Sequence, residues 1–228
     1  MTELNCNDIS PLDKFELVCL DFDGLLVDTE PIHYLAYKKM LSNRGIDLNL
    51  DFLSYSMYAH DVTGKSLGNY VLEKNQSIKD WDQLRIEKQA IYTEIITNSQ
   101  IKLMEGVDEF FKYLKKRKIL MCVVTNSMVG DTNIIRKQLP ILNQIPIWLT
   151  KDMYARGKPY PDGYLCALKH FQNIRSEKVV GLDDTLKGIS AMQLANIFPI
   201  LVCSKDHPQL KIKSTITHFF SLKNILIS

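Results

Sequence analysis

The sequence is poor in cysteine, in net charge and in long hydrophobic runs, and each shortage excludes a class of protein. Its five cysteines among 228 residues include no CxxC pair, which argues against a disulfide framework or a cysteine-based zinc site. A net charge of +2, with both signs interspersed, argues against nucleic acid as the main partner. No apolar stretch approaches the length of a membrane span, so we expect no membrane partner.

The N-terminus is polar and acidic and shows no signal-peptide pattern. Together with scattered, unpaired cysteines this favours a reducing compartment, and we expect a cytoplasmic protein. The one basic cluster, KKRK at residues 115–118, follows a helical pattern. We interpret it as the solvated C-terminal end of a helix, where cations are favoured by the helix dipole.

Five short apolar runs alternate with helical patterns along most of the chain. The runs predict strands at residues 17–20, 120–124, 145–149, 179–182 and 200–202. Helical periodicity between the later runs predicts helices at residues 107–116, 132–139, 164–171 and 186–194. Such alternation indicates an α/β fold, a doubly wound parallel sheet of the Rossmann-like kind with helices on both faces.

The segment between the first two strands has helical periodicity only. It spans roughly residues 32–100, far more than a βαβ crossover needs. We therefore predict a Rossmann-like core of residues 1–30 and 101–228, and an inserted α-helical cap domain of residues 31–100. A cap placed there would lie over the carboxyl end of the sheet, where closure can exclude water and select substrate.

Asp21 and Asp23 follow the first predicted strand, one residue apart, and Gly24 comes next. Burying two unpaired carboxylates at the end of an apolar strand is costly, so we expect a cation to neutralise them. Hard divalent metals prefer oxygen ligands, and the i, i+2 spacing directs both side chains to one face of a strand. Gly24 allows a sharp turn beside a ligand. The pattern predicts a magnesium-assisted site.

Polar side chains also follow the later predicted strands. Thr125 and Asn126 follow the second strand, Lys158 comes after the third across a short loop, and Asp183 and Asp184 follow the fourth. Ligands of an open parallel sheet bind outside the carboxyl ends of its strands. We therefore expect these groups to gather at one end of the sheet although they are far apart in sequence.

Charge balance favours a phosphate ester as the bound group. Clustered aspartates repel one another without cations, and Mg²⁺ and Lys158 supply the compensating positive charge. Thr125 and the backbone N–H of Asn126 can hydrogen-bond phosphoryl oxygens, helped by the dipole of the following helix. Each element alone has a structural explanation as a helix cap or a turn, and only the ordered combination is specific.

In this order, the residues resemble the motifs of the haloacid dehalogenase (HAD) superfamily. DFDGLLVDTE at residues 21–30 is similar to its first motif, Thr125 to its second, Lys158 within GKPYPD to its third, and Asp183-Asp184 to its fourth. The helical insertion is similar to the small helical cap of the branch that contains β-phosphoglucomutase and sugar-phosphate phosphatases. The resemblance covers about residues 15–205.

The resemblance implies a role for each matching residue. Asp21 would be the nucleophile that forms an aspartyl-phosphate, and Asp23 would protonate the leaving alcohol and then activate water. Thr125 and the amide of Asn126 would hold the phosphoryl group, and Lys158 would balance its charge. An acid at position 23 favours phosphate esters over haloacids, because a halide leaves without a proton.

The same resemblance implies a Mg²⁺ cofactor. Its ligands would be the Asp21 carboxylate, the Asp23 backbone carbonyl, and Asp183 or Asp184. Small-cap members are often monomers, so we expect a monomer whose partner is a small phosphorylated metabolite.

Within the cap, the resemblance places Thr29 and His33 at the hinge and Lys65 in the substrate-specificity loop. Where β-phosphoglucomutase carries an arginine for the second phosphate of its substrate, this sequence has Leu67. Lys65 or Lys88 could replace that cation, or both could be exposed helix residues.

Three functions are therefore weighed. The leading one is a Mg²⁺-dependent phosphatase for a sugar phosphate or similar metabolite. The second is a phosphosugar mutase, against which the leucine at position 67 counts. The third is a non-catalytic HAD-like regulator, against which the complete set of charged motif residues counts.

Overall fold

The computed structural model describes residues 10–61, 66–75, 78, 80–204, 207, 210 and 216–226. Its centre is a sheet in which every neighbouring pair of strands is parallel, in the order β3-β2-β1-β4-β5-β6. The strands are β1 Leu17–Leu20, β2 Leu120–Val124, β3 Ile147–Leu149, β4 Val179–Asp183, β5 Phe198–Val202 and β6 His218–Phe219. The predicted α/β Rossmann-like fold is confirmed.

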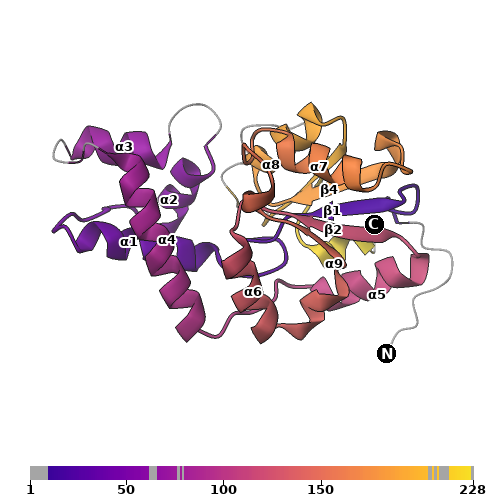
Figure 1. Cartoon of the computed structure of the whole chain (residues 1–228), viewed down its shortest axis with the longest axis horizontal. Coiled ribbons are helices and arrows are strands. Elements are labelled where there is room, and N and C mark those ends of the chain that lie inside the picture. The colour runs from indigo at the N-terminus through magenta and orange to yellow at the C-terminus, as the bar shows by residue number, and fades with distance from the viewer. Residues whose placement is uncertain are drawn as a thin grey trace.

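Helices of the core cover both faces of this sheet (Figure 1). Helices α5, α6 and α9 pack on one face, and α7 and α8 pack on the other. Their bounds are α5 Val107–Arg117, α6 Val129–Gln138, α7 Asp162–His170, α8 Leu186–Leu194 and α9 Leu222–Leu226. Residues Lys115, Lys116 and Arg117 form the exposed last turn of α5, as the basic cluster predicted.

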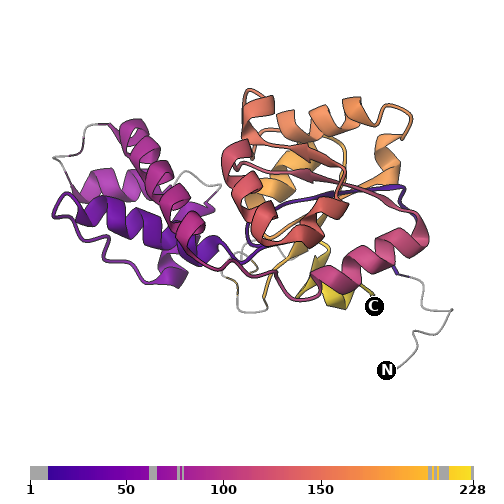
Figure 2. The same cartoon turned by 60° about the horizontal axis from the view of Figure 1, so that its bottom comes forward.

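Between β1 and α5 the described part of the chain forms four helices, which we call the helical insertion. They are α1 Glu30–Ser42, α2 Phe52–Ala59, α3 Leu67–Lys74 and α4 Trp81–Asn98. The insertion has its own apolar cluster, which includes Met40, Tyr55 and Leu84. Figures 1 and 2 show it as a lobe beside the sheet, joined to the core through α1 and α4. The predicted helical character of this segment is confirmed.

Strand β1 lies at the centre of the core because its side chains are apolar on both faces. Leu17 and Cys19 belong to the cluster under α7 and α8, whereas Val18 and Leu20 belong to the cluster under α5 and α9. Cys19 pairs in register with Cys122 of β2, and their buried thiol sulfurs lie 3.6 Å apart. The neighbouring Cys19 thiol and burial raise the pKa of Cys122 well above its ordinary value.

Several predicted boundaries were wrong. The third strand begins at Ile147 instead of residue 145, because Pro140 starts a 3₁₀ helix, Pro140–Gln144, that ends beside Ile145. The fifth strand begins two residues earlier than predicted, at Phe198, and α6 begins three residues earlier, at Val129. The short strand β6 was not predicted. Within the described ranges, every helix falls short of the length or the apolar character that a membrane crossing requires.

Candidate active site

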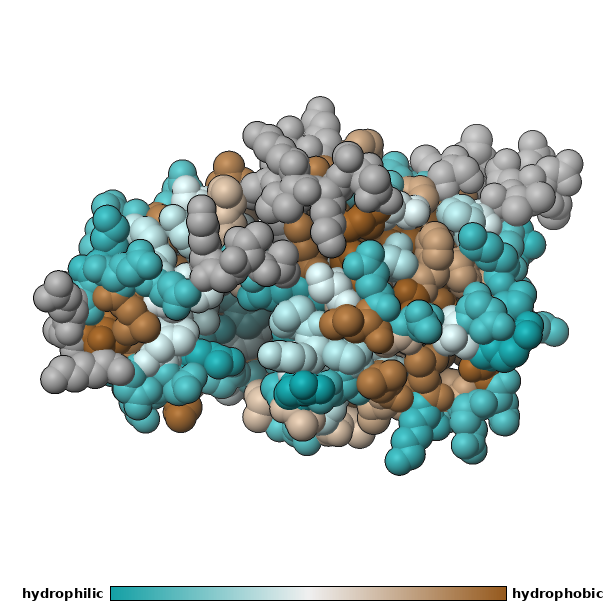
Figure 3. All heavy atoms as spheres, turned by 90° about the horizontal axis from the view of Figure 1, so that it is seen from above, coloured by the Kyte–Doolittle hydropathy of each residue, from teal (hydrophilic) through white to brown (hydrophobic). Residues whose placement is uncertain are grey.

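A cavity of about 1070 Å³ lies between the helical insertion and the carboxyl ends of the central strands. Its lining includes most of the residues predicted for the first three motifs and the hinge: Asp21, Asp23, His33, Thr125, Asn126 and Lys158. In Figure 3 a recess lined by hydrophilic residues separates the insertion from the core. The parallel topology therefore brings the expected groups to one place.

Three carboxylates lie close together behind this cavity. Asp21, Asp183 and Asp184 are buried, and each offers an oxygen within 4.8 Å of the others. Because β1 and β4 are neighbouring parallel strands, their carboxyl ends place these residues side by side. Burial, followed by the charge of Asp183, raises the pKa of Asp21 to about 8. Burial, followed by the charges of Asp183 and Asp21, raises the pKa of Asp184 well above its ordinary value.

Lys158 supplies the positive charge of the cluster. Its ammonium donates to Asp21 Oδ1 at 2.6 Å and to Asp183 Oδ2 at 2.7 Å, and only 6% of its side chain is exposed. Burial alone would lower the pKa of Lys158, but the charges of Asp183 and Asp21 raise it well above its ordinary value. Lys158 therefore favours its charged form and is aimed at the predicted nucleophile.

The two aspartates of the fourth motif have different surroundings. Asp183 accepts from Lys158, from the Thr185 backbone N–H at 2.9 Å and from the Thr185 hydroxyl at 2.7 Å. Asp184 Oδ1 is buried and, among the described residues, has no hydrogen-bond partner. Leaving a buried carboxylate oxygen unsatisfied is costly, so Asp184 is suited to donate a lone pair to a cation. The donor set, all carboxylate oxygen, suits Mg²⁺.

Asp23 lies beside this cluster and is held by hydroxyl groups. Its carboxylate accepts from Thr29 Oγ1 at 2.5 Å, from Tyr92 at 3.2 Å and from Ser127 Oγ at 2.5 Å, and His33 Nε2 lies at 3.5 Å. Burial opposes its ionisation, but the hydrogen bond from His33, followed by those from Ser127 and Thr29, lowers the pKa of Asp23. Two of these partners, His33 and Tyr92, come from the helical insertion.

His33 is itself positioned by the insertion. Its ring stacks on Tyr92 with the ring centres 4.0 Å apart, and its Nδ1 lies 2.6 Å from the Lys88 ammonium. An ammonium donates to Nδ1, which leaves the ring proton on Nε2, the atom that faces Asp23. Lys88 is buried, and burial lowers its pKa to about 8. Lys88 is thus part of the site and not an exposed helix residue.

Thr125 and Asn126 follow β2 and line the cavity. The Thr125 side chain is buried at the end of β2, and its hydroxyl oxygen accepts from the Ser127 backbone N–H at 3.0 Å. The Asn126 side chain contacts the loop that carries Lys158 and accepts from the Lys158 backbone N–H at 2.9 Å. Asn126 therefore holds Lys158 in place through its side chain, a contact that the sequence did not predict.

A second set of contacts joins the insertion to the wall of the cavity. Glu30, the first residue of α1, lies 2.9 Å from His60 Nε2 at the end of α2. The Lys187 ammonium, from α8 of the core, donates to the backbone carbonyl of Ala59. Thr29, which directly precedes α1, is buried and donates to Asp23.

Among the predicted cap residues, Lys65 lies outside the described residues. Leu67 is buried, 4% exposed, at the start of α3 in the apolar cluster of the insertion. No role was predicted for Ser127 or Tyr92, which both contact Asp23. Ser127 could have been predicted, because it is a polar residue that closely follows a strand. Tyr92 could not, because it belongs to a helix far from every motif.

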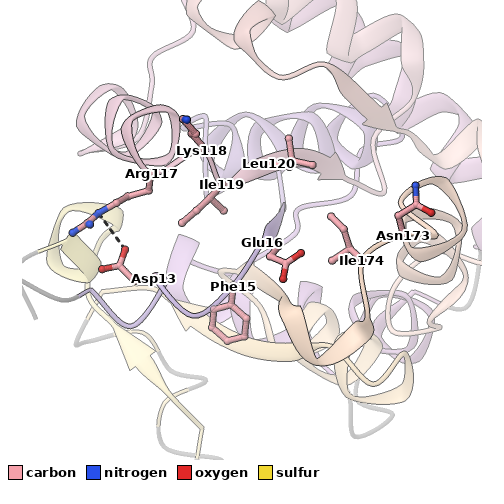
Figure 4. Close-up of a pocket in the computed structure, with 9 residues that line it drawn as sticks. All are labelled: Asp13, Phe15, Glu16, Arg117, Lys118, Ile119, Leu120, Asn173 and Ile174. Atoms are coloured by element: carbon pink, nitrogen blue, oxygen red, sulfur yellow. Dashed lines mark ion pairs between the residues drawn. The ribbon is translucent and has the colours of Figure 1, made fainter.

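A further cavity of about 610 Å³ opens at the opposite end of the sheet (Figure 4). It lies beside the first residues of β1 and β2. It contains an ion pair in which Arg117 Nε lies 3.3 Å from Asp13 Oδ1. None of the motif residues reaches it. The carboxyl end of the sheet is therefore the candidate active site.

Comparison with known proteins identifies the family of the chain. A family model described as haloacid dehalogenase-like hydrolase matches residues 18–202. A phosphorylated carbohydrates phosphatase of Thermotoga maritima is 26% identical over 183 residues, which is 80% of this chain and 82% of the relative. A phosphoglycolate phosphatase of Nitrosococcus oceani is 25% identical over 94% of this chain and 98% of its own length.

Solved structures share the fold. CbbY from Rhodobacter sphaeroides, solved with phosphate, superimposes with a TM-score of 0.74 at 21% identity, covering 92% of this chain and 96% of that one. A β-phosphoglucomutase from Clostridium difficile gives a TM-score of 0.68 at 22% identity, covering 92% of each chain.

Proposed function

Since the chain belongs to the haloacid dehalogenase-like hydrolases, we propose that it is a Mg²⁺-dependent phosphatase acting on a small phosphorylated metabolite through an aspartyl-phosphate. The observation that carries the proposal is the arrangement of Asp21, Lys158 and Asp184. A buried lysine is paired with the first carboxylate at 2.6 Å, and an unsatisfied carboxylate oxygen lies beside it. The relatives named above as phosphatases support hydrolysis of phosphoric monoesters.

The residues present fit a magnesium ion. Asp21 and Asp184 would hold it through their carboxylates and Asp23 through its backbone carbonyl, while Asp183, already occupied by Lys158 and Thr185, would orient the lysine. The backbone of Gly24 lies directly against Asp184, because a Cβ on Gly24 would come within 2.2 Å of Asp184 Oδ2. When bound, Mg²⁺ would neutralise carboxylate charge and polarise a phosphoryl oxygen.

The side chains divide the chemistry between them. An Asp21 oxygen attacks phosphorus, and the bond to the leaving alkoxide breaks as the aspartyl-phosphate forms. Asp23, whose lowered pKa favours the ionised form, first takes up a proton and delivers it to that alkoxide, then takes a proton from the water that attacks the aspartyl-phosphate. Lys158 stabilises negative charge on Asp21 and on the transferred group. The water step releases phosphate, frees the Asp21 carboxylate and returns a proton to Asp23.

The phosphoryl group would rest against the start of α6. The Thr125 hydroxyl and the Asn126 backbone N–H lie where β2 ends and α6 begins, and a helix N-terminus favours an anion. The Asn126 side chain adds rigidity by holding the loop of Lys158. One short segment would thus bind the phosphate and fix the lysine.

The helical insertion would act as the cap that covers this site, with the core formed by residues 1–30 and 101–228 and the cap by residues 31–100. Its residues already reach the reacting groups: Tyr92 and His33 contact Asp23. A cap that carries contacts to the general acid links closure to proton transfer.

The buried position of Leu67 favours hydrolysis over the mutase reaction. A mutase must bind a bisphosphate, but Leu67 is apolar and 4% exposed, and the buried Lys88 ammonium is already engaged with His33 Nδ1 at 2.6 Å. The regulator alternative has no such support, because Asp21, Asp23 and Lys158 are assembled with short hydrogen-bond distances.

The test is a panel of phosphorylated metabolites and one aryl phosphate, assayed for phosphate release with Mg²⁺ and with EDTA. We expect Mg²⁺-dependent turnover that Asp21→Asn lowers by at least about a thousandfold while the circular dichroism spectrum is unchanged. The exposed Asp82, which lines the same cavity, provides the control Asp82→Asn, which should retain activity. Turnover by Asp21→Asn at the wild-type rate would rule out the nucleophile, and isomerised sugar phosphate would favour the mutase.

A further inference from the structure

Asp131 is a buried carboxylate outside the catalytic cluster. It lies in the first turn of α6 and is 3% exposed. Its hydrogen-bond partners in the described structure are two neutral donors of the insertion: Thr93 Oγ1, at 2.6 Å, and the Gln89 side-chain amide. Burying a charge against neutral donors costs more than apolar packing of the same volume. The carboxylate therefore calls for an explanation beyond stability.

The two donors lie on α4 next to residues of the site. Lys88 directly precedes Gln89, and Tyr92 directly precedes Thr93, so both pairs repeat four residues apart on the helix. On one side, α4 presents Gln89 and Thr93 to Asp131. On the neighbouring side, Tyr92 donates to Asp23 and Lys88 contacts the ring that faces Asp23. A rotation of α4 about its axis would move both sets together.

The far end of the same interface is held separately. The side-chain amide of Gln138, the last residue of α6, donates to the Ile96 backbone carbonyl at 2.8 Å and accepts from the Ile101 backbone N–H at 3.2 Å. Helix α4 is therefore attached to α6 at two separate places along its length. Asp131 is the attachment closest to Asp23, and α6 is the helix that would receive the phosphate.

We propose that Asp131 is a positioning residue: it fixes the rotation of α4 so that Tyr92 and the His33–Lys88 pair hold Asp23 where it can protonate the leaving group. This inference rests on the proposed function, in which Asp23 is the general acid. Asp131 touches neither the phosphate site nor the reacting carboxylates, and it acts through α4. Displacements on the order of 1 Å lower rates by about a hundredfold in well-oriented sites.

The readout is the dependence on the leaving group. An alkyl phosphate needs a proton on its departing oxygen, whereas a nitrophenyl phosphate releases a stable phenolate without one. For each variant, kcat/KM is measured with p-nitrophenyl phosphate and with the alkyl phosphate that the wild-type protein hydrolyses fastest in the metabolite panel. Since kcat/KM covers only the steps up to alcohol release, the later attack of water does not enter the ratio.

Three variants distinguish a positioning role from a purely structural one. Asp131→Asn keeps the shape of the side chain but removes one acceptor, and Thr93→Val removes one donor with little change of volume. Thr97→Val is the matched control, because Thr97 lies one turn further along α4, is exposed, and its hydroxyl donates only to the Thr93 backbone carbonyl within the same helix, at 2.7 Å. Thermal unfolding of all three verifies that they fold.

We expect Asp131→Asn and Thr93→Val to lower the alkyl-to-aryl ratio of kcat/KM at least about tenfold, and Thr97→Val to leave it within about twofold. Equal loss on both esters, or a Thr93→Val protein that behaves like Thr97→Val, overturns the inference. If Asp131→Asn does not fold, the ratio measured for Thr93→Val decides between the two roles. A wild-type protein inert toward every ester overturns the proposed function itself, and this inference with it.

Discussion

Glu30 shows how a single side chain can link the insertion to the cavity wall. It is the first residue of α1, and its carboxylate lies 2.9 Å from His60 at the end of α2. Burial raises the pKa of Glu30, but the charge and hydrogen bond of His60 outweigh burial and lower it from 4.5 to about 2. The ionised form is therefore favoured in the folded state.

The sign of the resulting pH dependence follows from that shift. Above pH 4.5 the carboxylate is ionised in both the folded and the unfolded chain, and its full stabilisation is present. As pH falls from 4.5 toward 2, the unfolded chain binds the proton first, so this stabilisation is lost. We expect the difference in free energy of unfolding between wild type and Glu30→Gln to be largest above about pH 5 and to shrink steadily below it.

Urea unfolding at a series of pH values measures this difference. The matched control is Glu94→Gln, since Glu94 forms an exposed pair with Lys39 at 3.2 Å. Exposed pairs contribute little, about 0–1 kcal/mol, so this variant should follow the wild-type pH profile. A pH-independent difference for Glu30→Gln would contradict the role of the His60 pair.

The turn after β1 is set by Gly24, which has φ +76°. Gly45, after α1, has a similar φ of +69°, but a Cβ there would have nothing within 4 Å. Comparing alanine substitutions at the two glycines therefore separates the cost of backbone strain from the cost of a steric clash. Gly45→Ala should cost about 1 kcal/mol from strain alone. Gly24→Ala should cost more and weaken Mg²⁺ binding at least about tenfold, because the new methyl group would displace Asp184. Calorimetric titration and denaturant unfolding measure the two effects, and equal values for both variants would contradict the argument.

Strands were predicted where the sequence alone determines them. The runs at β1 and β2 are continuous and apolar because all of β1 and the last three residues of β2 are buried on both faces, and both predicted ranges match the structure. The start of β3 was wrong, since the apolar Ile145 belongs to the end of a 3₁₀ helix, and apolar character does not distinguish the two. Strand β6 has two residues, too few for any periodicity.

The candidate site was likewise predictable only in part. Asp21, Asp23, Thr125 and Lys158 could be located because strand ends must meet in a parallel sheet, and the structure brings them to one cavity. The contacts of Tyr92 and Asp131 could not, because they depend on how α4 packs against the core. The chemical roles of all these residues stay predictions, as do a cytoplasmic location and a monomeric state.

A bound cation should stabilise the entire fold, because the three clustered carboxylates come from β1 and from the end of β4. Ligand binding to the folded state adds about 2.7 kcal/mol when the free ligand is at about a hundred times its Kd. We expect Mg²⁺ to raise the Tm relative to EDTA in the wild-type protein.

Asp184→Asn should lose most of this rise, since it removes the carboxylate whose oxygen has no partner among the described residues. Asp82→Asn should keep it, because Asp82 is exposed at the rim of the cavity. Differential scanning calorimetry with and without Mg²⁺ measures the shift, and an unchanged shift for Asp184→Asn would exclude this residue as a ligand.

The paired thiols of Cys19 and Cys122 offer a practical consequence. Both are fully buried between neighbouring strands that end in the site, whereas Cys166 on α7 is only half-buried. An alkylating reagent can meet the first two only after the sheet has parted from its covering helices. The rate at which they are alkylated, measured by mass spectrometry, therefore reports how often the strands that end in the site open.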